Sequence, residues 1–239
     1  VSAFTRPVTS WSQQAYVKPS DIDAGDMFGY AVALTADGSI LAVGSFDEDG
    51  SSRTINGPAD NKSNGSGAAY VFTRTGTTWS QQAYIKPSNG EPQDSFGVHV
   101  ALSDDGSTLL VGSLDEDCTA TGVNAPGCDN DQKEDVSVGA AYVFVRSGGV
   151  WSLQQKLLAS DGATTDRFGS SVALELDTAV IGAPYKNSSQ GAVYDRAGAQ
   201  ISTSKPTINF GVFWDGDRMS EILDNEVIDK WNGNGTTRL

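Results

Sequence analysis

Apolar residues along this chain come in short runs that are rich in valine, leucine, tyrosine and phenylalanine. Asp-Gly, Asn-Gly and Thr-Gly pairs lie between many of these runs, and such pairs favour the tight turns of β-hairpins. Helical periodicity is nearly absent, and no apolar stretch approaches the ~18 residues that a membrane-spanning helix needs. The pattern therefore predicts an all-β protein without a membrane span.

The same pattern repeats along the chain, and a repeat decides the fold before any single motif does. Each unit carries a Phe-Gly pair that opens a Val-Ala-Leu segment, a Gly-Ala segment with tyrosine and valine, and a phrase that begins with tryptophan, of which WSQQAYVKPS is the first copy. The Phe-Gly pairs begin at Phe28, Phe96 and Phe168, the Gly-Ala segments at Gly67, Gly139 and Gly191, and the tryptophan phrases at Trp11, Trp79 and Trp151.

Each unit is expected to form four short antiparallel strands, which is the sheet of one β-propeller blade with long insertions. The second strand ends at Gly44, Gly112 or Gly182, and we interpret these glycines as sharp turns. The expected units are residues 28–86, 96–158 and 168–205, within a single propeller domain that spans residues 1–239.

The two ends of the chain are expected to close the propeller, because a blade has to pack against neighbours on both faces. The spacing from Phe4 to Trp11 matches the third and fourth strands of a unit, and a fourth Phe-Gly pair begins at Phe210. We expect residues 208–231 to join residues 1–18 in a composite fourth blade. A fragment, or two chains that share a larger ring as a homo-oligomer, are the alternatives.

These phrases resemble a known family. The Phe-Gly starts, the literal Gly182-Ala183-Pro184 and the GAVY that follows are similar to the FG-GAP repeat of integrin α-chain propellers and of many bacterial secreted proteins. The resemblance covers roughly residues 1–200 and implies a propeller in an extracellular protein. The tail, NFGVFWDGDRMSEILDNEVIDKWN, resembles a short segment of the rhamnogalacturonan lyases, whose catalytic domain is a large β-propeller with bound calcium. Residues 1–200 do not follow the lyase pattern.

The net charge and the cysteines bear on the partners and the cellular location of the protein. The net charge is −14 and the pI about 4.3, so the surface repels phosphate backbones and a nucleic-acid partner is not expected. Cys118 and Cys128 flank a short loop and can form a disulfide in an oxidising compartment, with a metal pair as the alternative. We therefore expect a secreted or extracellular protein.

Calcium is a candidate cofactor. Integrin-type blades bind it between the first two strands, but the corresponding turns here, at residues 35–38, 103–106 and 175–177, are too short for such a cage. Carboxylates instead gather after the second strand, where neighbouring negative charges repel each other unless a cation or solvent relieves them. The candidate ligands are Asp47, Glu48, Asp49, Asp115, Glu116 and Asp117, with Asp215 and Asp217 as a further pair in the tail.

Enzymatic signals are scarce. The chain has no nucleophile elbow, zinc-protease, P-loop or dinucleotide motif, and its single histidine, His99, occupies an ordinary strand position. A lyase would need a base and a cation, for which Lys230, Arg218 and His99 are the suggestive groups. Trp214 and Trp231 lie outside the repeat and could either stack on a sugar or pack in the core of the composite blade. We expect a non-catalytic module that binds a glycan or an extracellular protein, with a polysaccharide lyase as the alternative.

Overall fold

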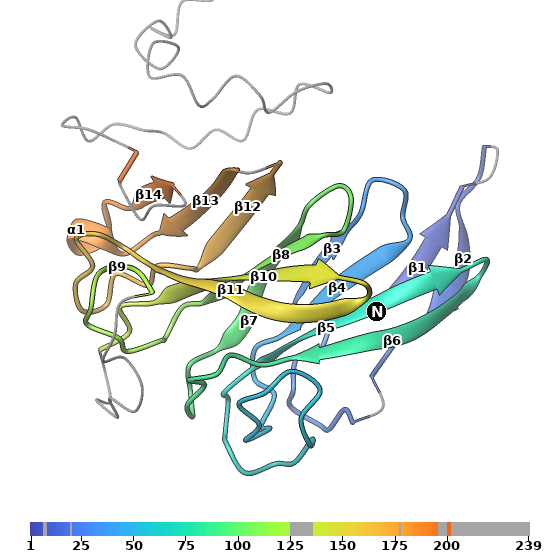
Figure 1. The fold of residues 1–239 in the computed structure, drawn as a ribbon, viewed down its shortest axis with the longest axis horizontal. Helices are drawn as coiled ribbons and strands as arrows, with labels where there is room; N and C mark the ends of the chain where they lie inside the picture. The colour runs from blue at the N-terminus through green and yellow to red at the C-terminus, as the bar shows by residue number, and fades with distance from the viewer. Residues whose placement is uncertain (7–8, 20, 125–135, 177, 196–199, 202–239) are drawn as a thin grey trace, which may run out of the picture. The chain divides into compact units, whose positions relative to one another are not determined.

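A computed structural model describes the chain except residues 7–8, 20, 125–135, 177, 196–199 and 202–239 (Figure 1). The one helical segment in the described residues, α1 (Lys186–Ser189), contains three residues with positive φ and is closer to a turn than to a regular helix. None of the described helices is long and apolar enough to cross a membrane. The strands are β1 (Ser2–Thr5), β2 (Ser12–Tyr16), β3 (Ala31–Leu34), β4 (Ile40–Ser45), β5 (Ala68–Thr75), β6 (Thr78–Ile85), β7 (Phe96–Leu102), β8 (Thr108–Ser113), β9 (Gly122–Val123), β10 (Ala140–Ser147), β11 (Val150–Leu158), β12 (Ser171–Glu175), β13 (Thr178–Ala183) and β14 (Ala192–Asp195).

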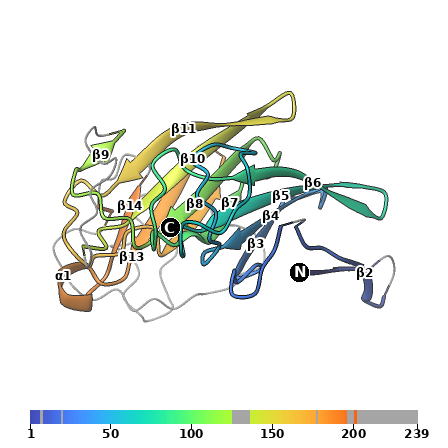
Figure 2. The same cartoon turned by 90° about the horizontal axis from the view of Figure 1, so that it is seen from below.

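The described strands form four antiparallel sheets that follow one another along the chain (Figures 1 and 2). The second sheet has the order β3-β4-β5-β6, so each strand pairs with the next one in sequence. The third sheet, β7-β8-β10-β11-β9, repeats this order and gains β9 at its edge from the long insertion after β8. The fourth sheet, β12-β13-β14, shows three strands within the described residues. The prediction of an all-β fold built from repeated antiparallel blades is confirmed, whereas the sequence did not indicate β9.

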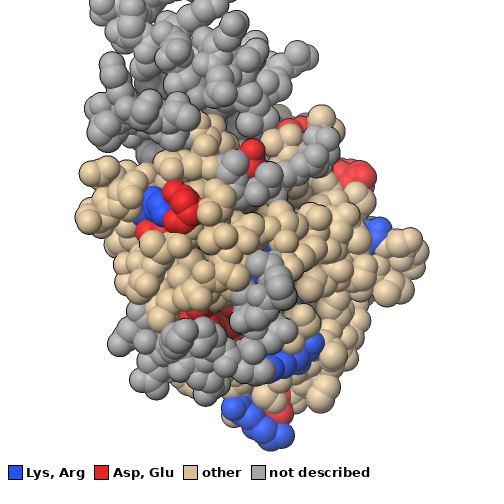
Figure 3. Space-filling view, turned by 60° about the vertical axis from the view of Figure 1, so that its left-hand side comes forward, with Lys and Arg blue, Asp and Glu red and all other residues tan. Residues whose placement is uncertain are grey.

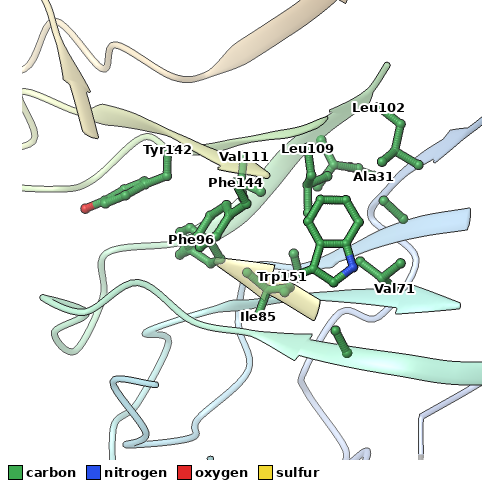
Figure 4. Close-up of a cluster of buried hydrophobic side chains, with 14 of the residues drawn as sticks. Ala31, Val71, Ile85, Phe96, Leu102, Leu109, Val111, Tyr142, Phe144 and Trp151 are labelled. Carbon is green, nitrogen blue, oxygen red and sulfur yellow. The ribbon is translucent and has the colours of Figure 1, made fainter. Parts of the chain in front are cut away.

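The inner strands of the second and third sheets are apolar on both faces because buried clusters lie on both sides of these sheets. Every residue of β4 is buried, and so is nearly every residue of β8. The largest buried cluster joins Ile85 of the second sheet to Phe96, Leu109 and Trp151 of the third (Figure 4). The hydrophobic core of the chain is therefore made largely of blade-to-blade contacts.

The glycines that end the second strands form the closest contact between blades. A side chain added at Gly44 would place its Cβ 1.9 Å from the carbonyl oxygen of Gly97, and one at Gly112 would lie 2.0 Å from that of Gly169. Gly97 and Gly169 are the Phe-Gly glycines of the following blades, and both have φ above +90°. The interpretation of Gly44 and Gly112 as sharp turns is therefore wrong. They lie inside β4 and β8 and leave room for the next backbone.

The phenylalanine of each Phe-Gly pair packs edge-on against a tyrosine of the third strand in its own blade. The ring centroids are 5.5 Å apart for Phe28 and Tyr70, 5.4 Å for Phe96 and Tyr142, and 5.2 Å for Phe168 and Tyr194. Edge-to-face packing at such distances is the favourable geometry for aromatic pairs. The Phe-Gly motif thus has two structural roles. The phenylalanine packs in the core of its own blade, and the glycine allows close contact with the backbone of the previous blade.

The face of the first complete blade that points toward the first hairpin is only partly covered by described residues: Leu41 and Val43 are buried there with Val17, but the edge strand β3 is not. Val32 and Leu34 on β3 are 56% and 55% exposed, whereas the equivalent Val100 and Leu102 on β7 are 3% and 8% exposed. β1 and β2 form an antiparallel pair at the positions that the repeat assigns to a third and a fourth strand. In the described residues β1 pairs with β2 alone. Residues 208–231 lie outside the described part, so the composite fourth blade stays a prediction.

Candidate ligand-binding site

A polar cavity of about 570 Å³ lies where loops of three successive units come together. The acidic groups of the face shown in Figure 3 form separate clusters rather than one continuous patch. Loops after β4 and β8 and the segments that lead into β7 and β12 supply the walls. The lining residues are Asp47, Asn64, Gly65, Glu91, Pro92, Gln93, Asp94, Ser95, Asp115, Asp117, Val136, Ser137 and Arg167.

The acidic triplets after the second strands are split between this cavity and the protein interior. Asp47, Asp115 and Asp117 line the cavity and are half-buried. Asp115 accepts a hydrogen bond from Ser95 Oγ at 3.0 Å and forms an ion pair with Arg167 Nε at 3.4 Å. Asp49 accepts a hydrogen bond from the backbone N–H of Gly65 at 2.8 Å. The structure therefore brings three of the predicted carboxylates together around one cavity.

The central glutamate of each triplet is buried and paired with a lysine. Glu48 lies 3.0 Å from Lys86 Nζ and 3.0 Å from the hydroxyl of Tyr84. Lys86 also donates to Ser66 Oγ at 2.6 Å and to the carbonyl of Gly67 at 2.7 Å. Burial lowers the pKa of Lys86 below its usual value, and the neighbouring Glu48 carboxylate opposes this effect. The oxygens of Glu48 are thus engaged inside the blade.

The same kind of cluster recurs in the other units with its charges rearranged. In the second complete blade Glu116 pairs with Lys156 at 2.9 Å. In the third, Lys186 stands at the position of the glutamate and pairs with Asp166 at 2.8 Å. Sequence reasoning missed these pairs. The signal that could have found them is that a basic residue occurs near the end of the strand that begins with Trp79 or Trp151.

Asp94 is a buried residue of the cavity wall. It lines the cavity, is only 3% exposed and accepts a hydrogen bond from the backbone N–H of Glu91 at 2.7 Å. Loss of hydration raises the pKa of Asp94 to about 8, and the nearby Glu116 carboxylate adds to the increase. Asp94 therefore holds a proton over much of the neutral range, which relieves repulsion among the acidic side chains.

This raised pKa predicts how stability depends on pH. The folded protein binds the Asp94 proton more tightly than the unfolded chain does. The stability that this proton contributes is therefore complete below the unfolded pKa of 3.8 and is lost as pH rises through about 8. We expect urea unfolding to show falling stability between pH 5 and pH 8, and Asp94→Asn to flatten that fall. Equal slopes for the wild type and Asp94→Asn would contradict the assignment.

The predicted calcium ligands do not form a ready cage. In the part of the chain that the structure describes, no three histidine, cysteine, aspartate or glutamate side chains are arranged to hold one metal ion. Asp215 and Asp217 lie outside the described residues. Calcium binding by these carboxylates stays a prediction.

The remaining sequence candidates are placed as follows. His99 lies on β7 and its Nδ1 accepts a hydrogen bond from the backbone N–H of Val172 at 3.4 Å, which gives it a contact with the next blade. Cys118 is fully buried, but Cys128 lies outside the described residues, so the disulfide stays a prediction. Four candidates also lie outside the described residues, namely Trp214, Trp231, Arg218 and Lys230.

The tryptophans of the repeat differ in burial. Trp151 is 4% exposed and its indole N–H donates to Gln82 Oε1 of the previous blade at 3.0 Å. Trp79 is half-buried, and Trp11 is 67% exposed. Trp151 therefore has a structural role, because it packs between two blades.

Comparison with known proteins gives one short match to a characterised enzyme. The chain is 44% identical over 43 residues to the rhamnogalacturonan endolyase YesW of Bacillus subtilis, a match that covers 18% of this chain and 7% of the enzyme. This agrees with the lyase resemblance noted in the sequence. Because the match spans so little of the enzyme, it does not transfer the activity.

Solved structures give weak overall matches. Sqt1 of Saccharomyces cerevisiae is 10% identical with a TM-score of 0.39, covering 75% of this chain and 35% of that one. The hydrazine synthase of Kuenenia stuttgartiensis is 15% identical with a TM-score of 0.41, covering 72% of this chain and 35% of that one.

The repeat itself gives the extensive match. The FG-GAP repeat family matches residues 11–72, 79–144 and 151–195, which together make up more than half of the chain. Each matched segment begins at the tryptophan of one blade and runs into the next. Gly44 lies in the first matched segment and Gly97 in the second, so the glycine contact described above joins two successive matches. The chain therefore belongs to the FG-GAP repeat family of β-propeller proteins.

Proposed function

We propose that this chain is a non-catalytic, extracellular propeller module that binds a glycan or a protein through the cavity lined by Asp47, Asp94 and Asp115. The observation that carries the proposal is the cavity itself, to which three successive units contribute polar side chains. Loops held by a rigid sheet scaffold are the usual location of binding sites in such folds.

The lining of the cavity defines the chemistry of its ligand. Carboxylates accept hydrogen bonds from sugar hydroxyls and attract the side chains of lysine and arginine, while Arg167 supplies one cationic donor. A strongly anionic ligand would be repelled unless a cation lay between the two. We therefore favour a ligand that presents hydroxyl or basic groups, with calcium as an additional bridge between the carboxylates and an acidic glycan.

Calorimetric titration tests the site with two probes, rhamnogalacturonan oligosaccharides and a peptide rich in lysine and arginine. Replacing both Asp47 and Asp115 by asparagine preserves their shape but removes their charge. We expect the affinity for the probe that binds to fall at least ~10-fold, equivalent to a loss of about 1.4 kcal/mol. The control is Asp104→Asn combined with Glu175→Gln, which removes the same charge from an exposed turn after β7 and from the exposed last residue of β12.

The outcomes separate the possibilities. Equal weakening by the two pairs of substitutions would contradict a site in the cavity and leave only a general effect of charge. If the oligosaccharide binds with calcium and no longer binds after addition of a chelator, calcium forms part of the site. An unchanged melting temperature after chelation in the absence of a ligand would exclude a structural role for the ion.

A polysaccharide lyase is the second candidate, and the match to the rhamnogalacturonan endolyase favours it. Such an enzyme cleaves by removing a proton beside a uronate, which leaves an unsaturated sugar end that absorbs in the ultraviolet. Incubation of the chain with rhamnogalacturonan and calcium should give no increase in absorbance if the module is non-catalytic. An increase that a chelator abolishes would replace the binding proposal with the lyase.

A further inference from the structure

Four polar side chains meet in a buried cluster where the segment after β6 packs against the next blade. Asn89 comes from that segment, while Glu116, Tyr142 and Lys156 belong to the next blade. The four residues are between 0% and 8% exposed. Their functional groups are therefore held together with little access to water.

Their hydrogen bonds surround the side-chain amide of Asn89. Asn89 Nδ2 donates to Glu116 Oε2 at 3.0 Å, and the hydroxyl of Tyr142 lies 3.1 Å from Asn89 Oδ1. Lys156 Nζ donates to Glu116 Oε1 at 2.9 Å, and the Tyr142 hydroxyl lies 2.6 Å from Glu116 Oε2. The amine and the amide thus sit on the two oxygens of one carboxylate. In Figure 4 the hydroxyl of Tyr142 points away from the other labelled side chains of the hydrophobic cluster.

This arrangement supplies every group needed for a transamidation, in which the lysine amine replaces the nitrogen of the asparagine side-chain amide. Lys156 provides an amine, and Glu116 accepts a hydrogen bond from Lys156 Nζ at 2.9 Å, so it is placed to take a proton from that amine. Glu116 also contacts the amide nitrogen, which must receive a proton in order to leave. The Tyr142 hydroxyl contacts the amide oxygen, where negative charge develops when the carbonyl is attacked.

We propose that Lys156 and Asn89 form an intramolecular isopeptide bond. The neutral amine moves from Glu116 Oε1 to the amide carbon, and a bond forms between Lys156 Nζ and Asn89 Cγ. Glu116 gives a proton to the amide nitrogen, the bond between Cγ and Nδ2 breaks, and ammonia leaves. The proton released from Nζ returns to Glu116, so the step needs no oxidant, reductant or other co-reactant.

The corresponding clusters of the other units lack one of these parts. Asp21 and Asp161 occupy the position of Asn89, and a carboxylate is a poor electrophile because its charge resists attack. In the last described unit Lys186 Nζ lies 3.4 Å from Asp161 Oδ2, but the side chain of Asp161 is 47% exposed and forms an ordinary ion pair. In the first complete blade Lys86 is held by Glu48, Ser66 and Gly67. We therefore infer one cross-link in the described part of the chain.

The bond would tie two consecutive blades together covalently. Asn89 follows the last strand of one blade and Lys156 lies on β11 of the next, so the bond closes a long loop of chain. A cross-link between distant residues stabilises a fold by restricting the unfolded chain, and the effect increases with loop length. It would resist reducing agents, unlike a disulfide.

Intact mass spectrometry of the folded 239-residue chain, after reduction and denaturation, tests the inference. We expect a mass lower than that of the sequence by one ammonia, and a proteolytic fragment in which the peptides containing Asn89 and Lys156 are joined. Glu116→Gln and Lys156→Arg should restore the full mass, whereas Lys86→Arg in the neighbouring cluster should keep the deficit.

The wild-type chain alone decides the question if a variant fails to fold. Circular dichroism before denaturation checks that the wild-type chain is folded. If that folded chain then has the full sequence mass after reduction, and its digest yields the two peptides separately, the isopeptide bond is overturned. A mass deficit that persists in Lys156→Arg would also overturn it, because the ammonia would then have come from another reaction.

Discussion

Replacing Gly112 by alanine is expected to lower the free energy of unfolding by about 3 kcal/mol or more, at the upper end of the cost of overpacking a core. The added Cβ would lie 2.0 Å from the carbonyl oxygen of Gly169 and 3.0 Å from its carbonyl carbon. Both are backbone atoms, which cannot rotate away as a side chain can. The two blades would have to separate along their whole contact. Urea unfolding followed by circular dichroism measures the loss.

A glycine outside the blade contact provides the control. Gly148 lies in the turn between β10 and β11, where an added Cβ meets no atom within 4 Å. Its φ is +56°, so alanine there is expected to cost ~1–2 kcal/mol from backbone conformation alone. Equal losses at Gly112 and Gly148 would contradict the view that the second-strand glycine exists to admit the neighbouring blade.

The second large effect is expected from removing one half of a buried ion pair. Lys86→Met leaves Glu48 as a buried carboxylate without its lysine, and breaking such a pair typically costs ~3–5 kcal/mol. The side chains of Lys86 and Glu48 are 1% and 3% exposed, so water cannot replace the lost contact without opening the blade. Thermal and urea unfolding of the variant measure the change.

The double substitution Lys86→Met and Glu48→Gln distinguishes a lost charge pair from lost packing. With both charges removed, Tyr84 can still donate to the side-chain oxygen of the new glutamine, and we expect much of the stability to return. If the double variant is as unstable as Lys86→Met, the lysine stabilises the blade through the packing of its methylene groups rather than through its charge.

The repeat made the main features of the fold predictable from sequence. The Phe-Gly and tryptophan phrases fix the period, and the apolar runs between turn pairs fix the strands, so the antiparallel sheets were expected in the right places. The role of Gly44 was misread because local sequence cannot distinguish a glycine that permits a turn from one that permits the close approach of a distant backbone. The same limit explains β9, which pairs through a long insertion.

The candidate site was predictable only in part. The acidic triplets stood out as charge clusters, and Asp47 and Asp115 do line the cavity. Glu48 lies in the loop after β4 and is buried, whereas Asp47 and Asp49 beside it are half-buried. Its partner Lys86 lies far away in sequence, so the charge pattern alone did not reveal the pair. Asp94 and Arg167 were not anticipated, because each reaches the cavity from a segment that precedes a Phe-Gly pair.

An amide NMR titration tests most directly whether the cavity shared by three units is the ligand site. We would titrate the isotope-labelled chain separately with rhamnogalacturonan oligosaccharides and with the basic peptide. One probe is expected to shift the signals of Gly65, Ser95 and Arg167 at the cavity and to leave those of Gly38 and Gly106, in turns at the other end of the blades, unchanged. Saturable shifts centred on Gly38 and Gly106, or none with either probe, would contradict the proposal.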